Sequence, residues 1–416
     1  MGHAQWLTAR SIVIGDGSPP RHDAAVLIES DRIVDIRPAA EAPRDAVDFG
    51  DATIAPGFVD AHVHLLFDYQ VDHQRTRRAV VESSRDRLLA RALYNGADCL
   101  RAGVTTIRDL GDRDGIVESA RDLIREGLVP GPRIYAAGTP VTITAGHLGW
   151  LGGRADSPQE IVALTRSLVA RGVDVIKVVA SGGNMTAESN KHLPQFTVDE
   201  LRLVVAEAHR GGLPVASHAH NSEAVRRSIA AGIDTIEHCG WFDAEGRLDL
   251  TEGDIESMRS SGAIASVTLA GIARQLLPDP EPTDDGAVEV ARQMSRSGGD
   301  LLADYEWARR LMAAGVEVLI SSDAGVRFTP FRGFLESVRA GVVAFDVDAS
   351  TAISLATLVP ARALRADADL GSIEPGKLAD LVVLDAVITE GSRDLGSVRS
   401  VYKDGRVVVA DGRMTW

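Results

Sequence analysis

The middle of the chain alternates short apolar runs with longer amphipathic segments of helical period. The runs are rich in β-branched residues, as expected for buried strands, and the amphipathic segments carry helix capping signals such as Thr197 with Glu200. The predicted strands are Phe58–Asp60, Val104–Arg108, Arg133–Ala137, Val175–Val179, Val215–Ser217, Thr235–Glu237, Ala263–Val267 and Val316–Ser321. The predicted helices include Val80–Arg101, Gly115–Glu126, Pro158–Arg171, Thr197–Arg210, Ser222–Ala231 and Leu301–Ala314.

Alternating strands and helices predict parallel strands, and eight such units favour an α/β fold of the closed (β/α)₈ TIM barrel type over residues 57–365. A doubly wound open sheet is the alternative. Such a sheet usually carries a glycine-rich phosphate turn after an early strand, and this sequence has none there.

The two ends of the chain have a different texture, with strand-like runs separated by turns. At the N-terminal end, Arg32–Ile36 is a predicted hairpin partner for Ala25–Ile28. At the C-terminal end, Asp404-Gly405 lies between two apolar runs, which is a hairpin signal. We therefore expect residues 1–56 and 366–416 to pair as one small β-domain beside the barrel.

Composition excludes several classes of function. The 416 residues carry a formal net charge of −15, which argues against nucleic-acid or anionic-membrane partners. Two cysteines, Cys99 and Cys239, cannot form a disulfide framework. No apolar run is long enough to cross a bilayer and no signal peptide is recognisable, so a cytoplasmic location is the expectation.

Residues with metal-binding chemistry follow several of the predicted strands. His62 and His64 are two positions apart, so on a strand both would project to the same side. The other candidates are His218 and His220 after the fifth strand, His238 after the sixth and Asp323 after the eighth. Active sites of barrels lie where the strands end, so these side chains are expected to converge on a metal site. For His62 and His64 alone, two unrelated half-buried histidines are the alternative.

Lys177 is the most informative single residue, because it is one of four lysines and lies inside a β-branched apolar strand. Burial without a counter-charge lowers the pKa of an ammonium group and favours the neutral amine. A neutral amine can react with carbon dioxide to form a carbamate, which can bridge two divalent cations. The alternative is a structural lysine that reaches solvent or pairs with an aspartate.

Eight segments resemble those of the amidohydrolase superfamily, most closely its imidazolonepropionase-like and Xaa-Pro-dipeptidase-like branch, which includes ochratoxin-hydrolysing amidases. They are APGFVDAHVHL, AGVTTIRDLG, TITAGH, VDVIKVVASGG, VASHAHN, IDTIEHCG, SSDAG and GSIEPGKLADLVVL, and they span nearly the whole chain. The resemblance implies a (β/α)₈ barrel with a β-sandwich built from both termini.

The resemblance also implies roles for individual residues. His62, His64 and Asp323 would hold one divalent ion and His218 and His238 a second, most often zinc, with the Lys177 carbamate bridging them. Asp323 would accept the proton of the attacking water, and His147, His220 and Arg327 would contact the substrate. The chain departs from the family pattern at Ala145 and Asn221, which bears on substrate preference.

The expected reaction is hydrolysis of the amide bond of an N-acyl amino acid, a dipeptide or a similar small amide by a metal-bridged hydroxide. The alternatives are a mononuclear deaminase or imidazolone-type ring hydrolase, a xenobiotic carbamate, urea or mycotoxin amide hydrolase with the same binuclear core, and a scaffold without activity. The stretch Thr268–Met294 is a candidate lid, and assembly into a homo-oligomer is compatible with the helical faces.

Overall fold

The computed structural model describes residues 4–70, 72–269 and 305–415, so most of the candidate lid Thr268–Met294 lies outside the described residues. The strands near the two ends of the chain are β1 (Ala4–Ile12), β2 (Arg21–Glu29), β3 (Arg32–Pro38), β4 (Val47–Asp48), β5 (Thr53–Pro56), β14 (Leu381–Leu384), β15 (Val398–Lys403), β16 (Arg406–Ala410) and β17 (Arg413–Met414). The central strands are β6 (Phe58–Val63), β7 (Val104–Asp109), β8 (Arg133–Ala136), β9 (Ile176–Val179), β10 (Val215–His218), β11 (Thr235–Glu237), β12 (Ile264–Thr268) and β13 (Val318–Ser321).

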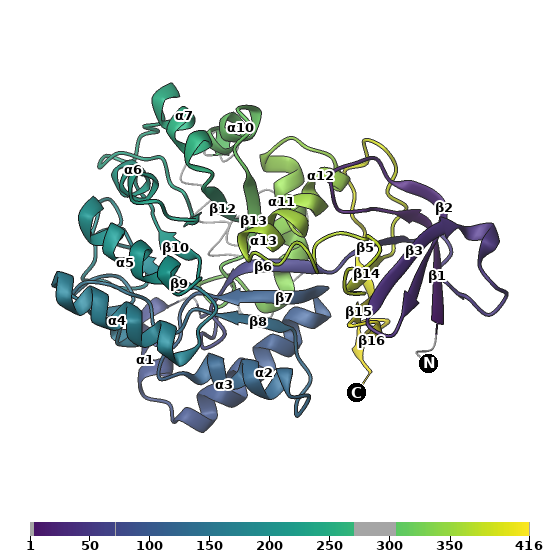
Figure 1. Ribbon diagram of the computed structural model, residues 1–416, viewed down its shortest axis with the longest axis horizontal. Helices are drawn as coiled ribbons and strands as arrows, with labels where there is room; N and C mark the ends of the chain where they lie inside the picture. Colours follow the sequence, from purple (N-terminus) through teal and green to yellow (C-terminus); the bar gives the residue numbers. More distant parts are fainter. Residues whose placement is uncertain (1–3, 71, 270–304, 416) are drawn as a thin grey trace.

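The central strands match the eight predicted runs and form two parallel sheets (Figure 1). One sheet has the order β6-β7-β8 and the other has the order β13-β12-β11-β10-β9. Parallel bridges join the two sheets at both edges, between Val63 and Ala324 and between Val141 and Val178. The carboxyl ends of all eight strands therefore belong to one connected system.

The helices are α1 (His73–Val81), α2 (Arg85–Arg101), α3 (Ile116–Arg125), α4 (Pro158–Arg171), α5 (Val198–Arg210), α6 (Ser222–Ala231), α7 (Glu252–Ser261), α10 (Glu306–Ala313), α11 (Phe334–Ala344), α12 (Ala349–Leu355) and α13 (Leu358–Ala363), with short 3-10 turns η1 (Ala39–Glu41), η2 (Gly149–Leu151) and η4 (Phe331–Gly333). Most follow a central strand, and α4 packs against α5 and α5 against α6 (Figure 1). The capping box of Thr197 and Glu200 at the start of α5 is present as predicted.

The single helix predicted over Val80–Arg101 is wrong, because α1 ends at Val81 and α2 begins at Arg85. The Ser84 side chain accepts a hydrogen bond from the Arg87 amide and so starts a new helix. Of the helix predicted over Leu301–Ala314, the described residues form α10 from Glu306 to Ala313, and residues 301–304 lie outside the described part of the chain.

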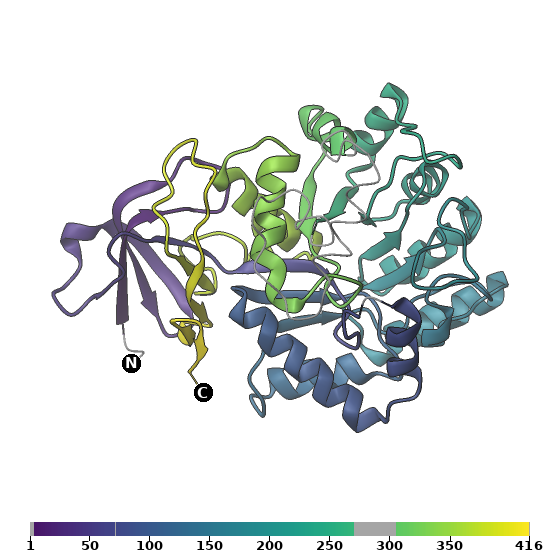
Figure 2. The same ribbon diagram turned by 180° about the vertical axis from the view of Figure 1, so that it is seen from behind.

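The two ends of the chain form one nine-stranded sheet, as the pairing prediction required (Figures 1 and 2). The two ends meet where β14 pairs antiparallel with β5. Both predicted hairpins, β2 with β3 and β15 with β16, are present. An apolar cluster that includes Leu7, Ile54 and Leu381 forms a core of its own for this sheet.

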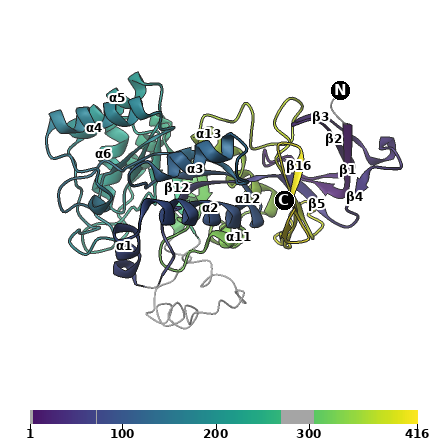
Figure 3. The same ribbon diagram turned by 90° about the horizontal axis from the view of Figure 1, so that it is seen from below.

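Seen from below, the terminal sheet lies at one end of an elongated molecule and helices α4 to α6 lie at the other (Figure 3). Both cysteines are free and buried, which agrees with the prediction that no disulfide framework exists. Within the described ranges, no helix combines the length and apolar character that crossing a bilayer requires.

Candidate metal centre

The backbone joint between β6 and β13 brings His62, His64 and Asp323 together. The His64 amide donates to the Ala324 carbonyl at 2.8 Å, and the Asp323 amide donates to the His62 carbonyl at 2.9 Å. As a result, Asp323 Oδ1 lies 3.5 Å from His62 Nε2 and 3.3 Å from His64 Nε2. These are the three residues that the family resemblance assigned to one metal ion.

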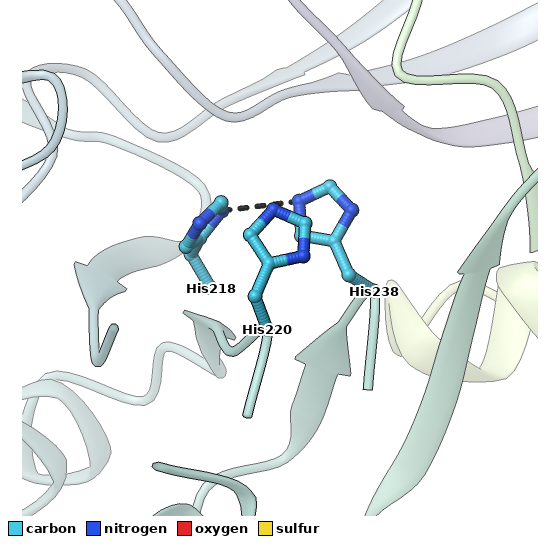
Figure 4. A group of neighbouring side chains, drawn as sticks. All are labelled: His218, His220 and His238. Carbon is cyan, nitrogen blue, oxygen red and sulfur yellow. Dashed lines mark hydrogen bonds between the residues drawn. The ribbon is translucent and has the colours of Figure 1, made fainter. Parts of the chain in front are cut away.

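Three further histidines face each other where β10 and β11 end (Figure 4). His238 Nε2 lies 3.0 Å from His218 Nδ1, and the His220 ring stacks on the His238 ring with centroids 4.2 Å apart. Ligand-type atoms of His218, His220 and His238 all lie within 4.8 Å of one another, and so do those of His62, His238 and Asp323. The ring of His220, which the family resemblance assigned to the substrate, therefore lies as close to the His238 ring as the His218 ring does.

His238 and Asp323 have backbone φ angles of 64° and 60°, in the left-handed region that few non-glycine residues adopt. His238 directly follows β11, and Asp323 lies two residues past the end of β13, so both residues stand in the turns that leave the strand ends. Strained backbone of this kind clusters at functional sites. The two residues therefore carry a conformational signature that agrees with the predicted metal-binding role.

Lys177 lies in β9 with 1% of its surface exposed. Its Nζ has no hydrogen-bond partner among the described residues, and neither does Oδ1 of Asp323. Burial lowers the pKa of Lys177 to about 8. Imidazole nitrogens, a carboxylate and an uncompensated amine match the donor set of a divalent zinc site, so the residues fit the metal that the resemblance implied.

A buried ion pair lies beneath His62, and sequence reasoning missed its role. Glu237 Oε1 accepts from Arg108 Nη2 at 2.7 Å, while Glu237 Oε2 lies 3.0 Å from His62 Nδ1. Burial opposes ionisation, but the charge of Arg108 and the contact with His62 hold the pKa of Glu237 well below its usual value. A charged residue inside the apolar run Val104–Arg108 is the signal that could have revealed Arg108, because the same signal revealed Lys177.

Asp60 in β6 stabilises the contact between β6 and the residues that follow β13. Its Oδ1 accepts from the Ser322 amide at 3.1 Å and from the His62 amide at 3.3 Å, and its other oxygen accepts from the Ser322 hydroxyl. Burial raises the pKa of Asp60 to about 7. This residue also lay inside a predicted strand without being recognised as part of the site.

The predicted substrate-contact residues line the same cavity. The His147 ring lies 4.6 Å from the His218 ring, and its amide donates to Gln195 Oε1 at 2.8 Å. Burial, followed by the charge of His220, lowers the pKa of His147 well below its usual value. Arg327 lies at the edge of the cavity with its guanidinium 5.2 Å from the Phe328 ring centre. His73 also lines the cavity and was not predicted.

Two adjoining pockets open above this centre. The first, of about 190 Å³, contains the predicted metal ligands together with His147 and Arg327. The second, of about 380 Å³, continues past His220 and His238 toward Lys191, Phe242 and Trp307. Trp241, which follows Gly240 of the second pocket, is fully buried in the core.

The amidohydrolase family model matches residues 53–408 of the chain. Ochratoxinase from Aspergillus niger is 27% identical over 450 residues, covering 97% of this chain and 86% of that protein. Imidazolonepropionase from Micrococcus luteus is 28% identical and covers 88% of each chain. A solved structure of a Xaa-Pro dipeptidase with bound methionine in the active site superposes with a TM-score of 0.79 at 30% identity, covering 97% of this chain and 99% of that one.

A match over this length settles the membership that the eight sequence segments indicated. The chain belongs to the amidohydrolase family and is a hydrolase of that family.

Proposed function

We propose that the protein is a binuclear metal-dependent hydrolase that cleaves the amide bond of an N-acyl amino acid, a dipeptide or a similar small amide. The observation that carries this proposal is the buried amine of Lys177, which has no hydrogen-bond partner among the described residues and lines one pocket with His62, His218, His238 and Asp323. The relatives named ochratoxinase and Xaa-Pro dipeptidase agree with amide hydrolysis.

The fold gives this site its support. We infer that the two bridges between the parallel sheets close the eight strands into a (β/α)₈ barrel over residues 57–365. The segments 1–56 and 366–416 then form the flanking β-domain. In a closed barrel all strand ends share one rim, which explains why ligands from β6, β9, β10, β11 and β13 converge.

The division of the ligands between two ions follows the family pattern. His62, His64 and Asp323 would hold one zinc ion, and His218 and His238 would hold the second. Lys177 would be the ligand shared by both ions as a carbamate, which forms when its neutral Nζ attacks carbon dioxide, makes the N–C bond and releases a proton. Bound zinc supplies a water of lowered pKa and polarises the substrate carbonyl.

The chain's own residues move the proton and orient the substrate. His62 and His64 hold the pKa of Asp323 below its usual value although burial opposes this, so Oδ1 is an ionised acceptor. Asp323 Oδ1 takes the proton of the attacking water and returns it to the leaving nitrogen. His147 and His220 are kept neutral by burial, so each offers the substrate one donor and one acceptor, and Arg327 supplies a cation at the rim.

Hydrolysis of a cyclic amide is the second candidate, favoured by the imidazolonepropionase relatives. Mononuclear members of the family generally do without the bridging lysine, so Lys177 argues against this reading. The same binuclear core would also serve a carbamate, urea or mycotoxin amide.

The test is zinc content measured together with hydrolysis of a panel of N-acyl and dipeptidyl amino acids. We expect two zinc ions per chain, and we expect Lys177→Ala and Lys177→Met to lower the zinc content and reduce turnover at least about a hundredfold. Lys377→Met is the matched control, because Lys377 is also buried but bonds Ser372 Oγ at 2.6 Å in another part of the fold. Full activity with two zinc ions in the Lys177 variants would refute the proposal.

A further inference from the structure

The second pocket adjoins the metal site and has a distinct chemistry. It shares His220, His238 and Thr268 with the pocket of the metal ligands. Beyond these residues its wall is apolar at Phe242, Val267 and Trp307, and cationic at Lys191. A group attached to the scissile amide can therefore extend from the metal site into this space.

Charge is distributed unusually in this pocket. The chain carries a net charge of −15, yet none of the described residues that line the pocket is acidic. Two of the four lysines pair with carboxylates, Lys377 with Glu374 at 3.4 Å and Lys403 with Asp404 at 2.6 Å. Lys191 is exposed and forms no ion pair with any described carboxylate. A local cation without a counter-charge in an acidic protein is suited to an anionic ligand group.

The backbone of Lys191 is fixed relative to the metal site. Asn221, the residue after His220, donates from Nδ2 to the Lys191 carbonyl at 3.0 Å. Its Oδ1 accepts from the Ala224 amide at 2.9 Å and so caps α6. An asparagine can perform both tasks because its side chain carries a donor and an acceptor. The departure from the family pattern at Asn221 therefore positions Lys191.

We infer that Lys191 binds the carboxylate of an amino-acid leaving group whose apolar side chain lies against Phe242 and Trp307. The inference rests on the proposed amide hydrolysis. We assign the carboxylate to Lys191 and not to Arg327, because Arg327 lies over the Phe328 ring in the pocket of the predicted metal ligands. The pocket at Lys191 has the larger volume of the two and the aromatic wall of Phe242 and Trp307.

Two substrates that differ only in the carboxylate test this inference with the zinc-loaded protein. N-acetyl-L-phenylalanine carries the carboxylate, and N-acetylphenethylamine lacks it. We expect the wild-type protein to prefer the former in kcat/KM by at least about tenfold, as a charge-assisted contact predicts.

The variants separate Lys191 from its neighbours. Lys191→Met should abolish the preference by lowering kcat/KM for N-acetyl-L-phenylalanine alone, Lys191→Arg should retain most of it, and Asn221→Asp should weaken it while keeping the helix cap. Lys403→Met, in the terminal sheet, is the control with unchanged kinetics. An equal loss on both substrates in Lys191→Met, or loss of the preference in Arg327→Gln instead, would overturn the inference.

A binding measurement keeps this inference separate from the proposed reaction. If the wild-type protein hydrolyses neither substrate, the amidase proposal fails for this class, but calorimetry can still compare L-phenylalanine with phenethylamine. Tighter binding of L-phenylalanine that Lys191→Met reduces about tenfold supports the carboxylate site. Equal or undetectable binding of the two compounds contradicts it.

Discussion

At the scale of single residues, the candidate metal site rests on charged side chains that are buried from solvent. Arg108 and Glu237 are both completely buried, and their pairing is completed by the Arg108 Nε hydrogen bond to the Ala61 carbonyl at 2.7 Å. A buried ion pair is costly to desolvate and gives little net stability, so a specific role is the better explanation for it. That role is visible at His62, whose Nδ1 faces Glu237 and whose Nε2 faces Asp323.

Glu237→Gln should weaken zinc binding roughly 10- to 100-fold, the usual effect of removing an outer partner of a ligating histidine. It should also destabilise the protein by about 3–5 kcal/mol, because Arg108 loses its counter-charge. Competition with a chelator measures the first effect and denaturant unfolding the second. Glu237→Gln combined with Arg108→Met should recover stability without recovering zinc affinity. Unchanged zinc affinity in the single variant would contradict the role of Glu237.

The sequence predicted the ligand-type residues because each follows an apolar run, a pattern that is readable one strand at a time. It did not predict Arg108, Glu237, Asp60 or His73, because their positions depend on how segments far apart in the chain come together. It also did not predict that His220 lies as close to His238 as to its strand neighbour His218, since that depends on side-chain rotation.

At the scale of elements, one glutamine joins two segments that border the site. Gln195 accepts from the His147 amide at 2.8 Å and donates to Thr142 Oγ1 at 3.1 Å and to the Val179 carbonyl at 2.8 Å. These bonds tie the loop after β9 to the segment that follows β8. They set the position of His147, which the proposed function places at the substrate.

Gln195→Leu should lower kcat/KM roughly 10- to 100-fold through misplacement of His147, with the zinc content unchanged. Thr197→Ala is the matched control, because it removes a nearby helix cap and about 1 kcal/mol of stability without touching His147. Steady-state kinetics and thermal unfolding of both variants provide the comparison. If the two variants lose the same small amount of activity, Gln195 has no positioning role.

Prediction at this scale succeeded where a local pattern decides the structure. The eight central strands and helices α4 and α6 follow from period and capping alone. The break between α1 and α2 was missed although residues 82–87 are all polar and Ser84 caps the start of α2. The bridges that join the two parallel sheets involve single residue pairs, which no periodic pattern can reveal.

At the scale of the whole molecule, the chain ends are fastened to the central strands by a partly buried cation. Arg133, at the start of β8, donates from Nη1 to Asp380 at 2.7 Å and from Nη2 to Asp404 at 2.6 Å. Asp380 precedes β14 and Asp404 forms the turn between β15 and β16. One side chain therefore connects the terminal sheet to the strands that carry the candidate metal site. Its removal tests how far the two parts depend on each other.

Arg133→Met should destabilise the protein by about 2–4 kcal/mol, less than for a fully buried pair because Asp404 is partly exposed. Burial favours the neutral form of Asp404, but Arg133 and Lys403 hold its pKa below the usual value. A carboxyl group whose pKa is lowered in the folded state contributes its full stabilisation above about pH 4, the pKa of an aspartate in the unfolded chain. This stabilisation is lost as the pH falls through the folded-state pKa. The difference in unfolding free energy between wild type and Arg133→Met should therefore be constant near neutral pH and shrink below about pH 4.

Arg125→Met, which breaks only the exposed pair with Asp122, should change stability by less than about 0.5 kcal/mol at any pH. A difference that stays constant as the pH falls below about 4 would show that Arg133 acts by packing and not through its charge.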